Sequence, residues 1–246
     1  MKTTIKTIFV ILFFLTPFYS SAQKTTDQIQ TEWLKAVNSA AALDEFYNNN
    51  SGLLINGKFA LVDELSEALK VFIKDQGNIK DYELLETHQL RDGQKLVLGK
   101  YSTATNKVFY SVIGWKQLGD WTKEFEVIYE HKPVANETDD VATAGRQAWE
   151  DHANEHRPDL IIENVNAQNG MYFNRGRLSH GDEIIEAYGY MNNENYRIKL
   201  ESLSGTRVNE NIFFDIGTYQ VGGKGLYLLI WTKEGDDWKI LLDFNF

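Results

Sequence analysis

The chain has 246 residues, no cysteine and a formal net charge of −10, and 43% of its residues are hydrophobic. This net negative charge argues against a nucleic-acid-binding protein, because the electrostatic field of the chain repels phosphate backbones. No run of Lys or Arg offsets that repulsion. The missing cysteines exclude disulfides and thiol nucleophiles, whereas the hydrophobic content is sufficient for packed cores.

The first 22 residues have the pattern of a secretory signal peptide. Lys2 and Lys6 precede an apolar run at 8–18, and the small residues Ser20-Ser-Ala22 follow it. The run is too short to span a bilayer, so we expect cleavage after Ala22 rather than a retained anchor. A lipid-anchored bacterial protein would need a cysteine at the cleavage site. The mature chain is therefore expected to be released, either periplasmic or secreted, with no membrane anchor.

Residues 23–130 are expected to form one domain, with helices first and strands after them. Ile29, Trp33 and Val37 recur at helical spacing behind a capping box that begins at Thr25. Residues 48–52 are rich in Asn and Gly and are expected to form a turn. The other predicted elements are a strand at 53–55, a helix at 59–73, and strands at 82–90, 94–101, 108–116 and 121–130.

Residues 131–141 are polar and contain Pro133, and we expect them to link this domain to a second one at 142–246. The second domain repeats the order of elements. Its predicted elements are helices at 142–156 and 159–165, a small strand at 170–173, a helix that residues 179–182 cap, and strands at 196–203, 211–219, 225–232 and 238–246.

The tryptophans indicate that the two domains are copies of one another. All six fall into pairs with offsets of 116, 116 and 117 residues, namely Trp33 with Trp149, Trp115 with Trp231, and Trp121 with Trp238. Gly99-Lys-Tyr101 and Gly217-Thr-Tyr219 match at nearly the same offset. Because tryptophan is rare, we interpret the chain as two tandem copies of a domain of ordinary size.

The C-terminal hairpin of each copy carries a family resemblance. In the second copy the residues concerned are Trp231, Gly235, Asp236, Trp238, Lys239, Ile240 and Asp243, and in the first they are Trp115, Lys116, Gly119, Asp120, Trp121 and Glu126. With the preceding helix, small strand and helix, this pattern resembles the nuclear-transport-factor-2-like superfamily, and more narrowly its SnoaL-like and ketosteroid-isomerase-like bacterial branch.

The resemblance implies an α+β fold with two tandem cone-shaped domains, each a curved antiparallel sheet wrapped around N-terminal helices. Each cone would enclose an apolar pocket, and the two domains would dock sheet to sheet. That shape serves isomerases, cyclases and dehydratases, and equally binding modules, so the fold alone does not assign a function. It implies no cofactor, and the Gly-rich run at 222–225 lacks the spacing of a phosphate-binding loop.

Asp215 is the candidate general base. It interrupts an apolar strand, and alternation places it on the same face as Phe213 and Tyr219. A carboxylate in an apolar cavity would have a raised pKa and could move a proton, with Tyr219 as the hydrogen-bond donor. The alternative is that this face meets solvent and Asp215 is a surface acid.

Other aromatic residues are candidates for contacts with a ligand, although strand packing also favours them. They are Tyr101, Tyr172, Tyr188, Phe213 and Tyr227. Glu126 and Asp243 recur at one position of both copies, and a structural hydrogen bond explains such a duplicated acid better than catalysis does.

A short zinc-like motif is present but is not expected to bind metal. His152, Glu155 and His156 match H-x-x-E-H, whose helical spacing would put both imidazoles on one face. Pro158 stops the helix at once, and a different fold already accounts for the chain. We therefore expect no metal site.

Three functions remain open from the sequence. The first is a binding or interaction module for a small apolar or amphipathic ligand, which suits the aromatic content. The second is a ketosteroid-isomerase-like isomerase or lyase that uses Asp215 in the second domain. The third is a pure scaffold whose pockets are filled by side chains.

Overall fold

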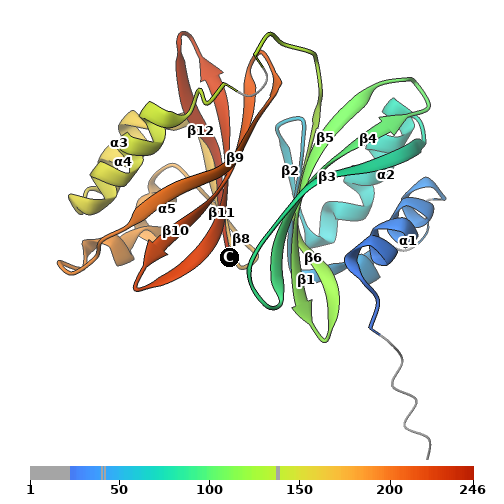
Figure 1. Cartoon of the computed structure of the whole chain (residues 1–246), viewed down its shortest axis with the longest axis horizontal. Helices are drawn as coiled ribbons and strands as arrows, with labels where there is room; N and C mark the ends of the chain where they lie inside the picture. Colours follow the sequence, from blue (N-terminus) through green and yellow to red (C-terminus); the bar gives the residue numbers. More distant parts are fainter. Residues whose placement is uncertain (1–22, 40, 42, 137–138) are drawn as a thin grey trace, which may run out of the picture.

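A computed structural model of the chain describes residues 23–39, 41, 43–136 and 139–246. These residues form two domains of the α+β class in tandem, each with a six-stranded sheet and helices on one side of it (Figure 1). The fold class expected from the sequence is confirmed. The expected signal peptide at 1–22 lies outside the described residues.

The first domain begins with a helix and ends with a long meander of strands. Its elements are α1 (Thr26–Asn38), η1 (Asp44–Phe46), β1 (Tyr47–Ile55), β2 (Lys58–Leu61), η2 (Val62–Glu64), α2 (Leu65–Gln76), β3 (Ile79–Arg91), β4 (Gln94–Thr103), β5 (Val108–Leu118) and β6 (Asp120–Glu130).

The second domain repeats this order with one more helix and a shorter helix after the small hairpin. Its elements are α3 (Thr143–Asn154), α4 (Pro158–Asn164), β7 (Asn166–Asn174), β8 (Arg177–His180), α5 (Asp182–Ala187), η3 (Gly189–Asn192), β9 (Lys199–Asn209), β10 (Ile212–Val221), β11 (Gly223–Glu234) and β12 (Asp237–Asn245).

The strand order is the same in both sheets, β2-β1-β6-β5-β4-β3 in the first and β8-β7-β12-β11-β10-β9 in the second. All neighbours are antiparallel except one pair in each sheet, β1 with β6 and β7 with β12. The sheets are therefore mixed rather than wholly antiparallel. This parallel pairing places the C-terminal strand of each domain in the middle of its sheet, where both of its edges are hydrogen-bonded.

The prediction of a helix at 59–73 is wrong for its first residues, which form β2 and η2. Asn56 and Gly57 have positive φ angles of 46° and 84° and form a tight turn, so the chain pairs back on itself as β2 before α2 begins at Leu65. The second domain has the corresponding strand, β8, where the sequence indicated the cap of a helix. A two-residue turn of this kind determines the pairing of its flanks and overrides their helical spacing.

Residues 48–52, expected to be a turn, belong to β1. The pairing with β6 is irregular between Tyr47 and Gly52, which accommodates the run of asparagines within the strand. Polar residues are tolerated there because the irregularity leaves them outside the regular ladder.

The helices are capped by residues next to them in the sequence. The capping box expected at the start of α1 is present: Gln28 N donates to Thr25 Oγ1 at 3.3 Å, and Thr25 N donates to Gln28 Oε1 at 2.9 Å. α2 ends at Gly77, whose φ of 75° suits a residue without a side chain. Within the described part of the chain, no helix combines the length and the apolar character that crossing a membrane requires.

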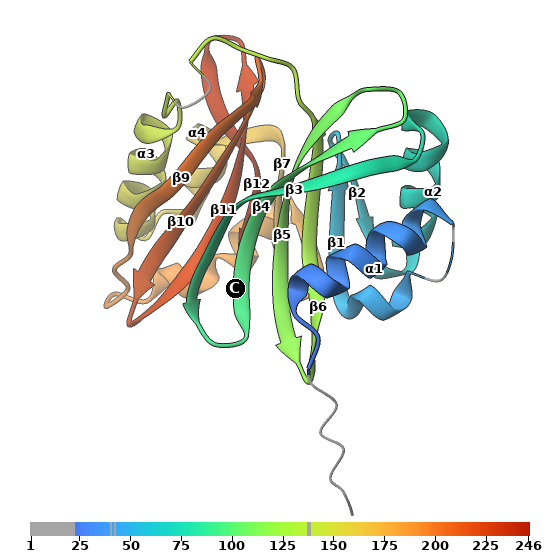
Figure 2. The ribbon, with the colours of Figure 1, turned by 45° about the vertical axis from the view of Figure 1, so that its right-hand side comes forward.

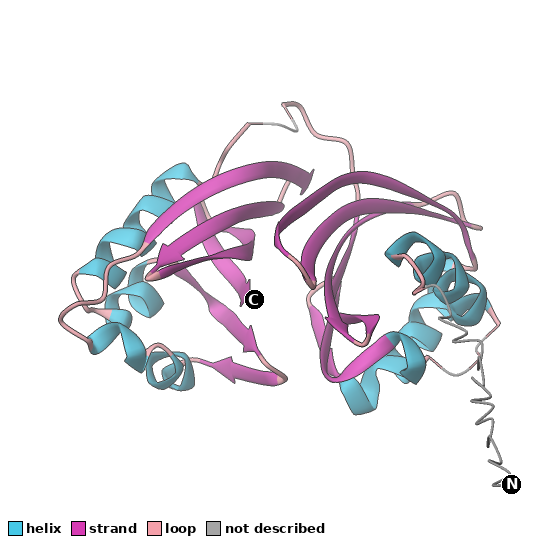
Figure 3. Cartoon of the chain, turned by 60° about the horizontal axis from the view of Figure 1, so that its bottom comes forward, coloured by secondary structure: helices cyan, strands magenta, loops and turns pink. Residues whose placement is uncertain are grey.

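Each sheet buries one face against its own helices. In the first domain this face carries Leu53, Val97, Ile113 and Ile128, which pack with Trp33 of α1. In the second domain the same packing involves α3, α4 and α5. Figure 3 shows each sheet curved around its helices, with the concave side turned away from the other domain.

The opposite faces of the two sheets pack on each other in the middle of the molecule (Figures 2 and 3). One apolar cluster contains residues of both domains, which are Leu54, Leu96, Leu98, Val112, Phe125, Val127 and Tyr129 of the first and Met171, Phe173, Val208, Ile212, Phe214, Ile216, Leu226, Leu228, Ile230, Leu241, Leu242 and Phe244 of the second. The two domains therefore share a core.

Phenylalanine rings form the centre of this shared core. Phe125 lies 4.9 Å from Phe244 and 5.7 Å from Phe173, measured between ring centroids. Gly114 of β5 makes room for them, since a Cβ atom there would come within 3.2 Å of the Phe244 ring.

Outside the cores, the connection between the domains is hydrogen-bonded to the second sheet. Lys132 N donates to Val208 O at 3.0 Å, and Asn209 Nδ2 donates to Glu130 O at 3.1 Å. β6 ends at Glu130 and α3 begins at Thr143.

Replacing Phe125 by alanine is expected to lower the free energy of unfolding of the whole chain by about 3–5 kcal/mol, because it opens a cavity in the shared core. Urea unfolding followed by circular dichroism measures this. The matched control is Leu118→Ala, whose side chain is 64% exposed, and it should change stability by less than about 0.5 kcal/mol. Equal effects of the two changes would contradict a core shared between the sheets.

Candidate functional site

The second domain contains a cavity of about 520 Å³ between the concave side of its sheet and its helices. Its lining residues are mostly aromatic, aliphatic or amide, and they are Trp149, Tyr172, Asn174, Tyr190, Asn193, Asn195, Tyr196, Ile198, Leu200, Tyr219, Val221, Gly222, Tyr227, Leu229, Asp243 and Asn245. Asn193, Asn195 and Gly222 are exposed and form its rim. The volume lies within the usual range of small-molecule pockets.

Two glycine–tyrosine pairs shape the sheet side of this cavity. Gly217 of β10 faces Tyr227 of β11, and Tyr219 of β10 faces Gly225 of β11. A Cβ atom on either glycine would come within 2.2 or 2.3 Å of the facing ring, so only glycine allows these rings to lie across the sheet. Tyr219 then reaches the end of the chain and donates to Phe246 O at 2.6 Å.

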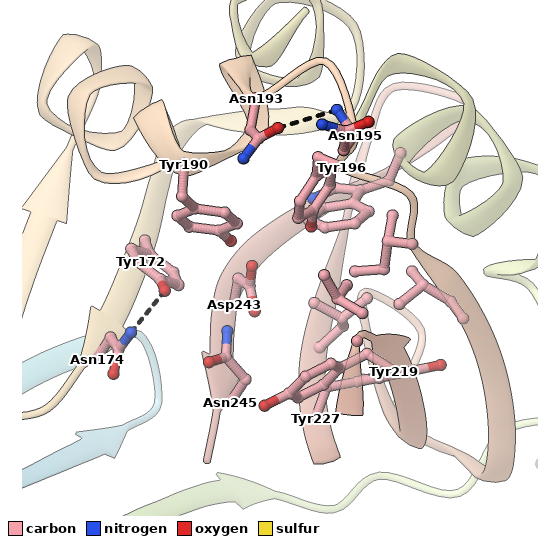
Figure 4. Close-up of a pocket in the computed structure, with 16 residues that line it drawn as sticks. Tyr172, Asn174, Tyr190, Asn193, Asn195, Tyr196, Tyr219, Tyr227, Asp243 and Asn245 are labelled. Atoms are coloured by element: carbon pink, nitrogen blue, oxygen red, sulfur yellow. Dashed lines mark hydrogen bonds between the residues drawn. The ribbon is translucent and has the colours of Figure 1, made fainter. Parts of the chain in front are cut away.

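Asp243 on β12 supplies a carboxyl group to the cavity. It pairs with Leu229 of β11 and Tyr172 of β7, and Figure 4 shows it in the centre of the lining residues. Tyr188 Oη donates to Asp243 Oδ2 at 2.5 Å. Burial raises the pKa of Asp243 to about 6, while the hydrogen bonds with Tyr188 and Asn245 act in the opposite direction.

The tyrosines around Asp243 remain protonated. Burial and the charge of Asp243 raise the pKa of Tyr188 well above its usual value, and burial is also the largest cause of the raised pKa of Tyr190 and Tyr196. The pKa of Tyr172 is raised to about 12 by burial, although Asn174 donates to its hydroxyl oxygen at 2.8 Å. These side chains therefore offer hydroxyl groups and ring faces without charge.

The corresponding interior of the first domain contains a buried ion pair. Glu126 occupies the position of Asp243 and accepts hydrogen bonds from Tyr47 Oη at 2.8 Å and Tyr101 Oη at 2.6 Å. Lys123 Nζ lies 2.8 Å from Glu126 Oε2 and 3.4 Å from the centre of the Trp33 ring. Burial lowers the pKa of Lys123 to about 8 even though Glu126 favours its charged form.

Three replacements distinguish the two interiors. Lys123 faces Trp115 across the strands, whereas Ile240 faces Trp231 at the same place in the second domain. Tyr101 faces Phe109, whereas its counterpart Tyr219 faces Gly225. Tyr47, next to Lys123, is replaced by Asn166 next to Ile240. At these three positions the second domain lacks the ammonium group, the phenyl ring and the phenol that the first domain has.

Asp215 is fully buried on the concave face, so the alternative that it is a surface acid is wrong. Arg146 Nε of α3 donates to its Oδ2 at 2.9 Å, and Ser202 Oγ donates to its Oδ1 at 2.6 Å. Burial raises the pKa of Asp215, and Arg146 and Ser202 oppose that shift. Asp215 is not among the residues that line the cavity, and its expected role as a base stays a prediction.

The other residues expected from the sequence are divided between the cavity and the cores. Tyr172, Tyr219 and Tyr227 line the cavity. Tyr188 is not a lining residue but donates a hydrogen bond to Asp243, which is one. Phe213 packs against Trp238 with ring centroids 6.5 Å apart. Tyr101 lies in the first domain and donates to Glu126. Their roles toward a ligand stay predictions.

Asp243, the acid that lines the cavity, was expected from the sequence to make a structural hydrogen bond and was not predicted as a site residue. Asp243 differs from its counterpart Glu126 in lacking a lysine three residues before it, since Ile240 stands where Lys123 does. That missing cation was the available signal. Tyr190 and Tyr196 carried no such signal, because Tyr190 lies in the short helix η3 and Tyr196 in the loop before β9.

The histidine motif at the end of α3 makes protein contacts. His156 has a positive φ of 61°, and its Nδ1 lies 2.6 Å from Met191 O, while Arg197 Nη1 lies 3.1 Å from its Nε2. Among the described residues no cluster of His, Asp and Glu could hold a metal ion.

No family model matches this chain, and a search of curated proteins also found no match. Solved structures resemble one half of it. An NTF-2-like protein of unknown function from Shewanella oneidensis is 17% identical, with 43% of this chain and 96% of that chain covered and a TM-score of 0.38. A ketosteroid isomerase-like protein from Erwinia carotovora atroseptica is 19% identical, with 44% and 94% covered and a TM-score of 0.36.

A third solved structure is a domain of unknown function with a cystatin-like fold from Nostoc punctiforme, 17% identical, with 42% of this chain and 72% of that chain covered and a TM-score of 0.37. Each half of this chain has the curved sheet wrapped around helices that the sequence resemblance implied. The two halves share one strand order. At such identities the likeness concerns the fold alone, and no activity follows from it.

Replacing Asp243 by asparagine is expected to flatten the pH dependence of stability between about pH 4 and pH 7. The folded chain holds the Asp243 proton up to about pH 6, whereas an ordinary aspartate loses it near 3.8. Stability is therefore lost as the pH rises through this window, by an amount on the order of 3 kcal/mol. Asparagine has no such proton to lose.

Urea unfolding of both proteins across this pH range measures the effect. Asp236→Asn, at an exposed position of the β11–β12 turn, is the control and should give a curve parallel to that of the unmodified chain. A parallel curve for Asp243→Asn would contradict a raised pKa at Asp243.

Proposed function

We propose that the second domain binds a small amphipathic molecule in its cavity and that the first domain is a solid partner that supports it. The observation that carries this proposal is the contrast between two copies of one fold. The first interior is occupied by the Lys123–Glu126 ion pair and Trp33. The second has about 520 Å³ of space at the equivalent place, lined by aromatic rings and amide groups.

The chemistry of the lining supports an amphipathic ligand. Tyr227, Leu229 and Trp149 offer apolar surface, which favours a ligand with an apolar body. Asn174, Asn193 and Asn245 offer hydrogen-bond donors and acceptors near the same space. A pocket of mostly apolar walls with a few polar groups is the usual form of a small-molecule site.

The location of this activity outside the cytoplasm is part of the proposal. It is supported by the basic, apolar and small-residue pattern of residues 1–22. The ligand would then be taken up from the periplasm or the medium.

A variant that fills the cavity is expected to lose its ligand. Leu200→Trp would place a large ring among the lining residues from β9, and a small molecule retained from a metabolite and lipid extract should disappear from native mass spectra. Leu203→Trp is the matched control, because Leu203 lies on the same strand and is 44% exposed. Retention of the same mass by Leu200→Trp would overturn the proposal.

Proton transfer by Asp243 is the second candidate function. It is favoured by a carboxyl group with a pKa near 6 that lies on an apolar cavity and contacts a tyrosine hydroxyl. A base with a pKa close to working pH suits the abstraction of a proton next to a carbonyl group. An isomerase or lyase of this kind would use Asp243 in place of Asp215, with the proton returned to another carbon or to water.

Deuterium uptake from heavy water by small cyclic enones, followed by nuclear magnetic resonance, tests this candidate. Asp243→Asn is expected to lower the exchange rate by about 10²–10⁴-fold, and the rate of the unmodified chain should rise as the pH passes through about 6. Exchange that Asp243→Asn does not alter would exclude Asp243 as the base and leave ligand binding intact.

A further inference from the structure

Asp243 differs from the other buried acids in having no cationic partner. Glu126 pairs with Lys123 at 2.8 Å, Asp215 with Arg146 at 2.9 Å, and Glu124 with Lys116 at 3.0 Å. Among the residues that the structure describes, these and Asp243 are the buried acidic side chains. Asp243 contacts only neutral groups of Tyr188 and Asn245. A buried carboxylate is stable when a positive charge lies beside it, so a partner from outside the chain would complete this site.

The cavity wall offers nothing that would repel a cation. Asp243 is the one lining residue whose side chain carries a charge at neutral pH, and the others are aromatic, aliphatic, amide or glycine. An anionic ligand would therefore meet a carboxylate without any lysine, arginine or histidine to offset it. The net charge of −10 also favours the approach of cations to the molecule.

The aromatic side chains around Asp243 suit an organic cation in particular. Six of them line the cavity, namely Trp149, Tyr172, Tyr190, Tyr196, Tyr219 and Tyr227. The faces of such rings carry partial negative charge and attract ammonium groups, and they also pack against hydrocarbon. Within the first domain this attraction is already present, since Lys123 Nζ lies 3.4 Å from the centre of the Trp33 ring beside Glu126.

We propose that the cavity of the second domain binds an organic ammonium ion, with its positive group against Asp243 and its apolar body against the tyrosines. The proposal rests on the ligand-binding function and names the class of ligand. The ligand would do for Asp243 what Lys123 does for Glu126 in the first domain, where a cation lies beside a carboxylate and an aromatic ring. Ile240, at that position in the second domain, brings no charge.

The charged and titratable groups near Asp243 are consistent with this arrangement. Those near it are neutral tyrosines. Tyr172 lies on β7, Tyr188 between α5 and η3, Tyr190 on η3, Tyr196 before β9, and Tyr219 on β10. Arg91 and Arg175 act on the Tyr219 hydroxyl and lower its pKa. Neither arginine is among the residues that line the cavity, so the ammonium group is expected beside Asp243.

Matched pairs of small probes test the proposal on the mature chain. Isothermal titration compares 2-phenylethylamine with 2-phenylethanol, tryptamine with tryptophol, and hexylamine with hexanol, each amine being protonated at neutral pH. We expect the amine to bind at least about tenfold more tightly than its alcohol, which corresponds to about 1.4 kcal/mol. Asp243→Asn should abolish this preference, whereas Glu201→Gln, which removes a charge from a side chain that is 68% exposed, should keep it.

A second measurement needs no variant. As the pH falls below about 6, Asp243 takes up a proton, so the affinity for the amines should fall while that for the alcohols stays constant. Equal binding of amines and alcohols, or a preference that survives in Asp243→Asn, would overturn the cation proposal and leave a neutral amphipathic ligand. If no probe binds, and Leu200→Trp and the unmodified chain retain the same molecules from an extract, the ligand-binding function fails as well.

Discussion

The convex faces of the two sheets pack against each other, and this contact determines where the chain can bind another molecule. Phe125, Phe173 and Phe244 lie at its centre, and a single apolar cluster extends over both sheets. Burial of so much apolar surface is the main favourable term available to the fold. Because one face of each sheet is used in this way, the aromatic cavity of the second domain lies on the concave side, between the sheet and its helices.

The two concave sides have the same backbone and different chemistry. Each has an acid on its C-terminal strand, Glu126 or Asp243, with tyrosine donors around it. In the first domain Lys123 neutralises the acid and fills the space above it. In the second domain Ile240 brings no charge to offset Asp243, and Gly225 faces Tyr219 without a side chain. One copy can therefore stabilise the molecule while the other is available for a ligand, an arrangement that a tandem duplication allows.

Much of the fold could be predicted from the sequence because strand and helix patterns are local. The paired tryptophans, the alternation in the hairpins and the capping box at Thr25 each depend on residues close together in the chain. The errors were local too: the turn at Asn56 and Gly57 produced a strand, β2, where the spacing of apolar residues indicated a helix. Turn geometry there overrode periodicity, because positive φ angles reverse the chain within two residues.

The sequence by itself indicated that the chain is a duplicated α+β protein, and strand alternation indicated which residues share a face with Asp215. The sequence left open whether that face is buried. It could not decide which copy is hollow or which acid meets the cavity. Those outcomes depend on the sum of side-chain volumes and charges that strands distant in the chain bring together, such as Gly225 against Tyr219 and Arg146 against Asp215. Only the tertiary structure assembles those neighbours, and so it gave Asp215 a partner and left Asp243 facing an open space.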